Sequence, residues 1–256
     1  RHHYGVDCWR QHDRFILQAG CSQQSNSTQA SSSTSTEITE AQTQTTSSSA
    51  QSSSTGEETM ESSSSSSETG TSSKATFNGS YYSVQGKYGE VVIANKKHPL
   101  AKDYAPGENP EALAAFQQLV ADMQAKGFDV SNNYSGFRSY ETQAILYQSY
   151  VNQEGQVVAD TYSARPGYSE HQTGLAFDIL DSAGNLLEEP TASKWLADNA
   201  RLYGFIVRYQ PGKESSTGYI AESWHVRYIG QEATDIYQSG LTLEEYYGVP
   251  GGDYQE

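Results

Sequence analysis

The sequence has little cysteine, few basic residues and no long hydrophobic run, and each scarcity excludes a class of protein. Its two cysteines, Cys8 and Cys21, precede the region rich in apolar residues, so we expect neither a disulfide nor a cysteine metal ligand in the folded part. Lysine and arginine total 16 against 31 acidic residues, for a formal net charge of −15. A nucleic-acid-binding protein needs a basic face, so that function is excluded. No apolar run in the chain approaches the length of a membrane-spanning helix.

Residues 22–75 consist mostly of serine, threonine, glutamine and glutamate, with almost no large apolar side chains. Such a segment cannot bury enough apolar surface to offset the conformational entropy lost on ordering. We therefore predict that residues 22–75 form a disordered Ser/Thr-rich tether. A single folded domain is expected over residues 76–250, which is long enough for one hydrophobic core.

Residues 1–21 resemble a degenerate bacterial lipoprotein signal. The segment Leu17-Gln18-Ala19-Gly20-Cys21 is similar to a lipoprotein cleavage site in which Cys21 is lipidated. The apolar run before it, Phe15-Ile16-Leu17, is much shorter than that of an ordinary signal peptide. In the alternative interpretation Cys21 is incidental. The expected location is extracytoplasmic, at the cell surface or cell wall, and lipidation of Cys21 would be the only attachment to a membrane. The chain is expected to be a monomer.

The remaining sequence predicts helices and short strands in mixed order. Asn109-Pro110-Glu111 is typical of a helix start, and Gly127 of its end. Other helices are expected over residues 139–150, 191–203 and 231–238, and strands over residues 174–180, 204–209 and 222–229. Because helices and strands do not alternate regularly, the predicted fold class is α+β.

Two polar motifs lie in or beside these predicted strands. The first runs from Ser169 to Asp178 with the sequence SEHQTGLAFD, and the second is Glu222-Ser-Trp-His225. An ionised Asp178 in an apolar strand is costly unless it is paired or bound to a metal. With His171 and His225 it would make a three-ligand site whose open fourth position is typical of zinc hydrolases. The pattern predicts Zn²⁺ bound by His171, Asp178 and His225.

Two further charged residues could take part in the chemistry. Glu222 lies three residues before His225 and is a candidate general base, which would take a proton from water and pass it to the leaving amine. Arg138, at a predicted strand-to-helix junction, could bind either a terminal carboxylate or a developing oxyanion. Gln143 follows near the start of the same helix and could support the same ligand.

Each of these residues also has an ordinary structural explanation when taken alone. Asp178 could cap a turn, Glu222 could lie on the surface, and Arg138 could form a structural ion pair. Their joint occurrence favours the functional interpretation, because isolated short motifs are often coincidental. His98 has no comparable polar neighbours, and we interpret it as a structural residue near the turn at Pro99.

These motifs resemble those of the VanY/LdcB-type zinc carboxypeptidases of bacterial cell walls, which release D-alanine. The shared patterns are S-x-H-x-x-G-x-A-x-D, then E-x-W-H, with S-G-[FY]-R-S before them at residues 135–139. The resemblance spans residues 98–229. It implies a small α+β domain with a central antiparallel sheet and flanking helices, related to the metal-binding domain of hedgehog proteins.

The resemblance also implies residue roles. Zinc would be bound by His171, Asp178 and His225, and Glu222 would be the catalytic base. Substrate would be contacted by residues around the cleft, namely Arg138, Ser139, Gln143, Ser169, Tyr209 and Trp224. The substrate would be a peptidoglycan stem peptide. Phe137, Gln143 and the Glu-Ser-Trp-His motif look closer to L,D-carboxypeptidases, which act on tetrapeptides. The alternatives are D,D-specificity on pentapeptides or a non-catalytic, zinc-containing module that binds cell-wall peptides.

Overall fold

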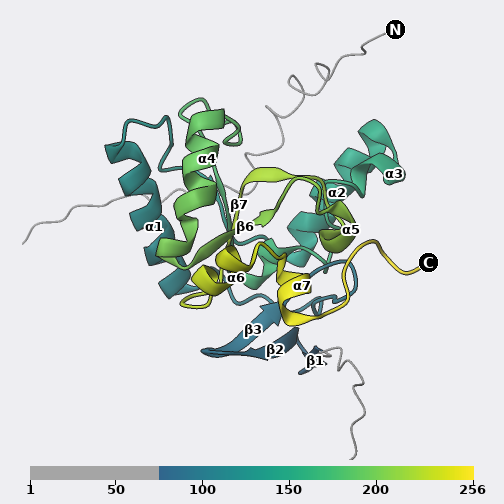
Figure 1. The fold of residues 1–256 in the computed structure, drawn as a ribbon. Helices are drawn as coiled ribbons and strands as arrows, with labels where there is room; N and C mark the ends of the chain where they lie inside the picture. The colour runs from purple at the N-terminus through teal and green to yellow at the C-terminus, as the bar shows by residue number, and fades with distance from the viewer. Residues whose placement is uncertain (1–74) are drawn as a thin grey trace, which may run out of the picture. The chain divides into compact units, whose positions relative to one another are not determined.

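The computed structural model describes residues 75–256, which form two antiparallel sheets and several helices (Figure 1). The first sheet has three strands in the order β1-β2-β3, with bounds Thr76–Phe77, Tyr82–Gly86 and Gly89–Ile93. The second has four strands in the order β4-β5-β7-β6, with bounds Tyr134–Ser135 (β4), Ala176–Ile179 (β5), Phe205–Tyr209 (β6) and Glu222–Tyr228 (β7). The predicted α+β class and central antiparallel sheet are confirmed.

The predicted helices form close to their expected positions. Helix α1 (Pro110–Ala125) begins where the Asn109 side chain accepts a hydrogen bond from the Ala112 amide, as predicted. Helix α2 (Tyr140–Glu154) extends four residues beyond the predicted end at residue 150. Helix α4 (Pro190–Asn199) continues as the 3₁₀ helix η4 (Ala200–Tyr203), and α6 spans Ala233–Ser239.

Strand β4 lies just before Arg138, where a strand-to-helix junction was predicted. Several other short elements were not expected from local patterns. They are the sheet β1-β2-β3, the 3₁₀ helix η3 (Glu170–Thr173), and helices α3 (Gln156–Ala159), α5 (Glu214–Thr217) and α7 (Leu243–Tyr247). Elements this short gain little from local propensity and depend on tertiary packing. Helix α7 did carry a local signal, because Thr242 and Glu245 form a capping box.

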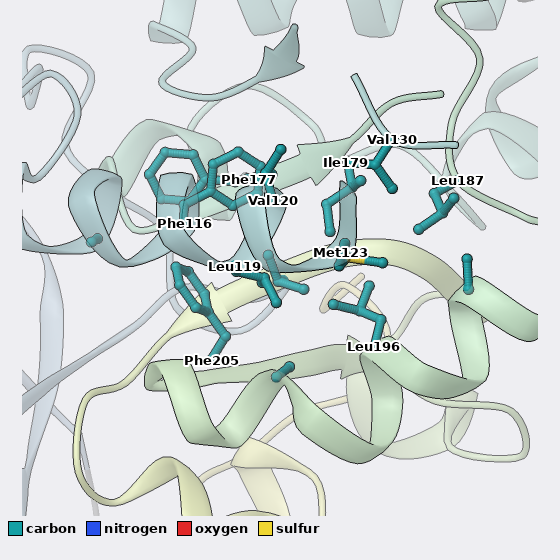
Figure 2. Close-up of a cluster of buried hydrophobic side chains, with 14 residues drawn as sticks. Phe116, Leu119, Val120, Met123, Val130, Phe177, Ile179, Leu187, Leu196 and Phe205 are labelled. Carbon is teal, nitrogen blue, oxygen red and sulfur yellow. The ribbon is translucent and has the colours of Figure 1, made fainter. Parts of the chain in front are cut away.

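One face of the four-stranded sheet packs against helices α1 and α4. We call this cluster the helix-side core; its members include Phe116, Leu119, Val120, Met123, Phe177, Ile179, Leu196, Phe205 and Val226 (Figure 2). The Phe116 and Phe177 rings stack with centroids 4.7 Å apart. This packing holds β5 and β7 rigidly from one side, so their opposite face can carry polar groups in defined positions.

The opposite face contributes to a second cluster, which we call the tail-side core. It joins Ile206 of β6 to the three-stranded sheet, α6 and α7 through Val84, Val91, Ile93, Ile236, Leu243 and Tyr247. Ala75 also belongs to this cluster, and Asp253 forms an ion pair with Lys96, so ordered contacts extend past residue 250. His98 is buried and pairs with Asn95 through its Nδ1 atom, as expected for a structural residue.

No helix among residues 75–256 is both long and apolar enough to cross a membrane. The predicted lipidation site at Cys21 and, apart from Ala75, the predicted tether lie outside the described residues.

Candidate metal centre and active site

The three predicted metal ligands meet on the face of the four-stranded sheet that is opposite the helix-side core. Antiparallel pairing of β5 with β7 places Asp178 directly opposite His225, and Asp178 Oδ1 lies 3.1 Å from His225 Nδ1. His171 comes from η3, just before β5, and its Nε2 lies 3.2 Å from Asp178 Oδ2. One ligand atom from each residue lies within 4.8 Å of the others, and all three residues are buried.

A tight turn brings His171 over the strand. The Ser169 hydroxyl accepts a hydrogen bond from the His171 amide at the start of η3. Gly174 ends η3 with a φ of 72°, a conformation that favours glycine. A Cβ atom there would also lie 1.9 Å from the Gly107 carbonyl oxygen. The motif therefore needs glycine at this position for both backbone conformation and space.

Hydrogen bonds fix the orientation of both imidazole rings. His171 Nδ1 lies 2.9 Å from the Gly136 carbonyl oxygen, which can only accept, so this nitrogen carries the proton. His225 Nε2 lies 3.1 Å from Glu170 Oε2. The other ring nitrogens, His171 Nε2 and His225 Nδ1, then face Asp178, as shared ligation of one metal ion requires.

A buried oxygen of Asp178 supports the fit to a cation. Asp178 Oδ1 has no hydrogen-bond partner among the described residues, although His225 Nδ1 lies 3.1 Å away. A nitrogen and an oxygen that face each other in this way can both bind one metal ion. Two imidazoles and one carboxylate are a common ligand set for catalytic zinc, with the fourth position left for water or substrate.

The charge around His225 also favours a cation. Burial lowers the pKa of His225, but the neighbouring carboxylates of Asp178 and Glu170, which favour the charged ring, outweigh burial and raise this pKa to about 10. A neutral imidazole therefore leaves the surrounding negative charge uncompensated. A divalent ion bound at Nδ1 supplies the same compensation as a proton would.

The carboxylates of Asp178 and Glu222 have opposite pKa shifts. Burial would raise the pKa of Asp178, but His171 and His225 outweigh burial and hold it well below its usual range. Burial raises the pKa of Glu222 to about 8, and Asp178 adds to the rise while His225 opposes it. Asp178 thus remains an ionised ligand, whereas Glu222 can exchange a proton near neutral pH, as a general base must.

A β-bulge places Glu222 on the same side as His225. Between the pairs Val207↔Val226 and Tyr209↔Glu222, β6 advances two residues and β7 advances four, so β7 contains two extra residues. Bulges next to active sites commonly redirect a side chain. Here Glu222 Oε2 lies 3.7 Å from His225 Nδ1.

Arg138 is held beside the metal centre by three contacts. Its guanidinium donates to Ser135 Oγ at 3.0 Å and to Gln143 Oε1 at 2.8 Å. Its backbone amide donates to the His171 carbonyl oxygen at 3.1 Å. Gln143 is fixed in turn, because its amide nitrogen donates to the Ala164 carbonyl oxygen. Arg138 and Gln143 therefore form one supported unit next to His171.

The other predicted substrate residues lie in different settings. The Ser139 hydroxyl caps α2 by accepting from the Thr142 amide, and Ser169 caps η3. The Tyr209 ring lies 4.9 Å from the His225 ring, so it borders the metal centre. Trp224 packs against the helix-side core, on the face of β7 opposite His225. The structure does not bring Trp224 together with the other predicted site residues.

Sequence reasoning missed three charged residues, namely Glu170, which contacts His225 Nε2, and Arg208 and Arg227, which contact Glu170. Glu170 accepts from Arg208 Nε at 2.8 Å and from Arg227 Nη1 at 3.0 Å. A signal was present, because both arginines interrupt apolar strand segments and a buried arginine needs an acidic partner. The partner could not be identified without the fold.

The chain is similar to known carboxypeptidases over most of the described region. The family model VanY, described as D-alanyl-D-alanine carboxypeptidase, matches residues 107–231. A D-alanyl-D-alanine carboxypeptidase of Enterococcus faecalis is 41% identical over 178 residues, which cover 61% of this chain and 65% of that relative.

Two solved structures add to this comparison. A crystal structure of the L,D-carboxypeptidase DacB from Streptococcus pneumoniae is 61% identical, with a TM-score of 0.69, covering 71% of this chain and 98% of that one. A zinc complex of the D,D-pentapeptidase VanY from a vancomycin-resistance cassette is 34% identical, with a TM-score of 0.52, covering 60% and 96%.

Proposed function

Since the chain belongs to the VanY family of D-alanyl-D-alanine carboxypeptidases, we propose that it is a zinc L,D-carboxypeptidase that releases the terminal D-alanine of tetrapeptide stems. The observation that carries the proposal is the buried His171–Asp178–His225 site with Glu222 3.7 Å from a ligand atom. This arrangement supports the proposal, because zinc-dependent hydrolysis of a peptide bond uses a set of metal ligands and a nearby proton acceptor.

His171 Nε2, Asp178 and His225 Nδ1 would hold the zinc ion, which supplies a Lewis acid and lowers the pKa of bound water. Positive charge at that point would also lower the pKa of Glu222 and favour its ionised form. Glu222 then accepts a proton from the attacking water. It delivers that proton to the nitrogen of the leaving D-alanine as the C–N bond breaks.

Arg138 binds the negative charge of the substrate. Gln143 and Ser135 hold its guanidinium from one side, which orients the group before substrate arrives. The guanidinium can contact either the terminal carboxylate or the oxygen on which charge develops. Tyr209 lies beside His225 and would line the same cleft.

The L,D preference rests on similarity. Identity is 61% to the L,D-carboxypeptidase DacB and 34% to the D,D-pentapeptidase VanY, and the first alignment covers more of this chain. D,D-specificity is the second candidate, because the matched family and the Enterococcus faecalis relative are both described as D-alanyl-D-alanine carboxypeptidases. A peptide-binding module without activity is disfavoured, because a buried Glu222 beside a ligand is not needed for binding alone.

Release of D-alanine from defined stem peptides tests the proposal. Zinc-loaded protein is incubated with a tetrapeptide and with a pentapeptide, and the products are separated and weighed by mass spectrometry. We expect conversion of tetrapeptide to tripeptide, and loss of this activity after zinc is removed by a chelator and its return with added Zn²⁺. Cleavage of the pentapeptide alone would show D,D-specificity instead of L,D-specificity. Binding of both peptides without cleavage of either would refute the proposed enzymatic activity.

We also propose an extracytoplasmic location, with a monomer attached to a membrane through a lipid on Cys21. The support is the resemblance of residues 17–21 to a lipoprotein cleavage site and the position of peptidoglycan outside the membrane. Mass spectrometry of protein from native cells tests the anchor. A chain that retains residues 1–20 and an unmodified Cys21 would refute it, and size-exclusion chromatography with light scattering tests the monomer.

A further inference from the structure

We infer that Glu170 is a positioning residue that orients the zinc ligand His225, and that Arg208 and Glu244 hold Glu170 in place from the C-terminal part of the chain. This inference rests on the proposed zinc-dependent function. It concerns residues that touch neither the substrate nor the metal.

The Glu170 carboxylate bridges the ligand and two arginines. Its side chain is 0% exposed. Oε2 accepts a hydrogen bond from His225 Nε2 at 3.1 Å, on the side of the ring that faces away from Asp178. Oε1 accepts from both Arg208 and Arg227, at 2.8 and 3.0 Å. The carboxylate is therefore held at three points, and its orientation sets that of the imidazole.

The network continues from Arg208 to helix α7. Arg208 donates to both oxygens of Glu244, at 2.6 and 2.8 Å, in a two-bond contact. Asn95 donates to Glu244 Oε1 at 3.1 Å, so Glu244 is fixed from a second side. Both arginine and both glutamate side chains are almost completely buried. Residues of α7 lie outside the segment 107–231 that the family model matches.

Stability alone does not account for this set of buried charges. The cost of removing charges from water commonly equals or exceeds their mutual attraction, and apolar residues of similar volume serve stability as well. The network instead ends at a metal ligand. An acceptor hydrogen-bonded to the outer nitrogen of a ligating histidine fixes its tautomer and ring orientation.

Glu170 acts by fixing the tautomer of the His225 imidazole. An ionised Glu170 only accepts hydrogen bonds, so it holds the proton on His225 Nε2 and leaves Nδ1, which faces Asp178, as the nitrogen that would bind zinc. In Glu170→Gln the amide can present its NH₂ group to His225 Nε2, or present its oxygen there and its NH₂ group to the arginines. The first arrangement favours a His225 tautomer with its proton on Nδ1, the nitrogen needed for the metal. The second sets the NH₂ group against the arginine donors, so the side chain that holds His225 loses its own support.

The test compares three variants by metal binding, without substrate. Zinc dissociation constants are measured by competition with a chromophoric chelator, and the visible absorption bands of the cobalt-substituted protein report ligand geometry. We expect Glu170→Gln to raise the zinc dissociation constant roughly 10–100-fold and to shift the cobalt bands. Glu244→Gln should change both in the same direction by a smaller factor.

Glu232→Gln is the matched control. Glu232 is also buried and accepts hydrogen bonds from the Tyr246 and Tyr247 hydroxyls and from the Lys87 amide, but it has no contact with the metal ligands. This variant should lower the unfolding temperature while leaving zinc affinity and the cobalt bands at wild-type values.

Wild-type zinc affinity and cobalt bands in Glu170→Gln would overturn the inference, and so would an equal change in Glu232→Gln. Should Glu170→Gln not fold, Glu244→Gln decides in the same way, because unchanged binding and bands there would overturn it. Failure of the wild-type protein to cleave stem peptides would refute the proposed function, whereas these metal measurements judge Glu170 separately.

Discussion

Glu222 Oε2 lies 3.7 Å from His225 Nδ1, although residues three apart in a regular strand point to opposite faces of a sheet. The two extra residues of β7 between the pairs formed by Val226 and Glu222 remove this conflict. The bulge thus places the Glu222 carboxylate, the candidate base, beside a candidate metal ligand without adding another structural element. Trp224, which lies within it, packs against the helix-side core and closes the other face of the strand.

Replacing Glu222 should separate catalysis from metal binding. In Glu222→Gln we expect kcat for D-alanine release to fall by about 10²–10⁴, because the proton acceptor is lost while the three ligands remain. Zinc content, measured by atomic absorption, should stay at one ion per chain. Glu141→Gln, at an exposed position of α2, serves as the control and should keep wild-type activity. Near-normal turnover in Glu222→Gln would contradict its assignment as the base.

The stability of the metal-free protein should depend on Glu222 in a defined pH range. Burial raises the folded-state pKa of Glu222 from 4.5 to about 8, so the folded state binds more protons than the unfolded state between these values. The contribution of Glu222 to the free energy of unfolding is fully present below pH 4.5 and is lost as pH rises through about 8.

Chemical denaturation of zinc-free protein across this pH range measures the effect. As pH rises, the free energy of unfolding of the wild type should fall relative to that of Glu222→Gln, because the amide does not ionise. A difference that is constant over the same range would contradict the raised pKa.

Arg138→Lys should distinguish the two roles left open for the guanidinium. A lysine cannot make the paired contacts with Ser135 and Gln143 while also binding substrate, so kcat/KM should fall by about 100-fold or more. If Arg138 binds only the terminal carboxylate, the loss should appear mainly in KM. If it stabilises developing charge, kcat should fall as well. Steady-state kinetics on the tetrapeptide measures both, and unchanged values would exclude Arg138 from the site.

Alanine at Gly174 should be more harmful than alanine at Gly184. Both glycines have positive φ, at 72° and 82°, so each substitution carries a backbone cost of about 1–2 kcal/mol. At Gly184 a Cβ atom meets nothing within 4 Å, whereas at Gly174 it would lie 1.9 Å from the Gly107 carbonyl oxygen.

Urea denaturation of both variants measures this difference. Gly174→Ala should lose more free energy of unfolding than Gly184→Ala, and it should also lose zinc affinity, since the turn carries His171. Equal losses in the two variants would show that the close approach to Gly107 is relieved at little cost.

Sequence alone determined much of the candidate site, because the chemistry predicted for it depends on residue types at short spacings. His171 and Asp178 lie in one continuous motif, and Glu222 and His225 in another. Helices such as α1 were also predictable, since the cap at Asn109 and the stop at Gly127 are local signals. The α+β class followed from the order of these elements.

Tertiary structure alone decided which groups meet. The pairing of Asp178 with His225 depends on the register of β5 and β7, and the position of Glu222 depends on a bulge against β6. The contact from Glu170 through Arg208 to Glu244 joins segments 36 or more residues apart. Local periodicity carries no information on such register or on long-range partners, because both are set by the packing of the whole sheet between its two cores.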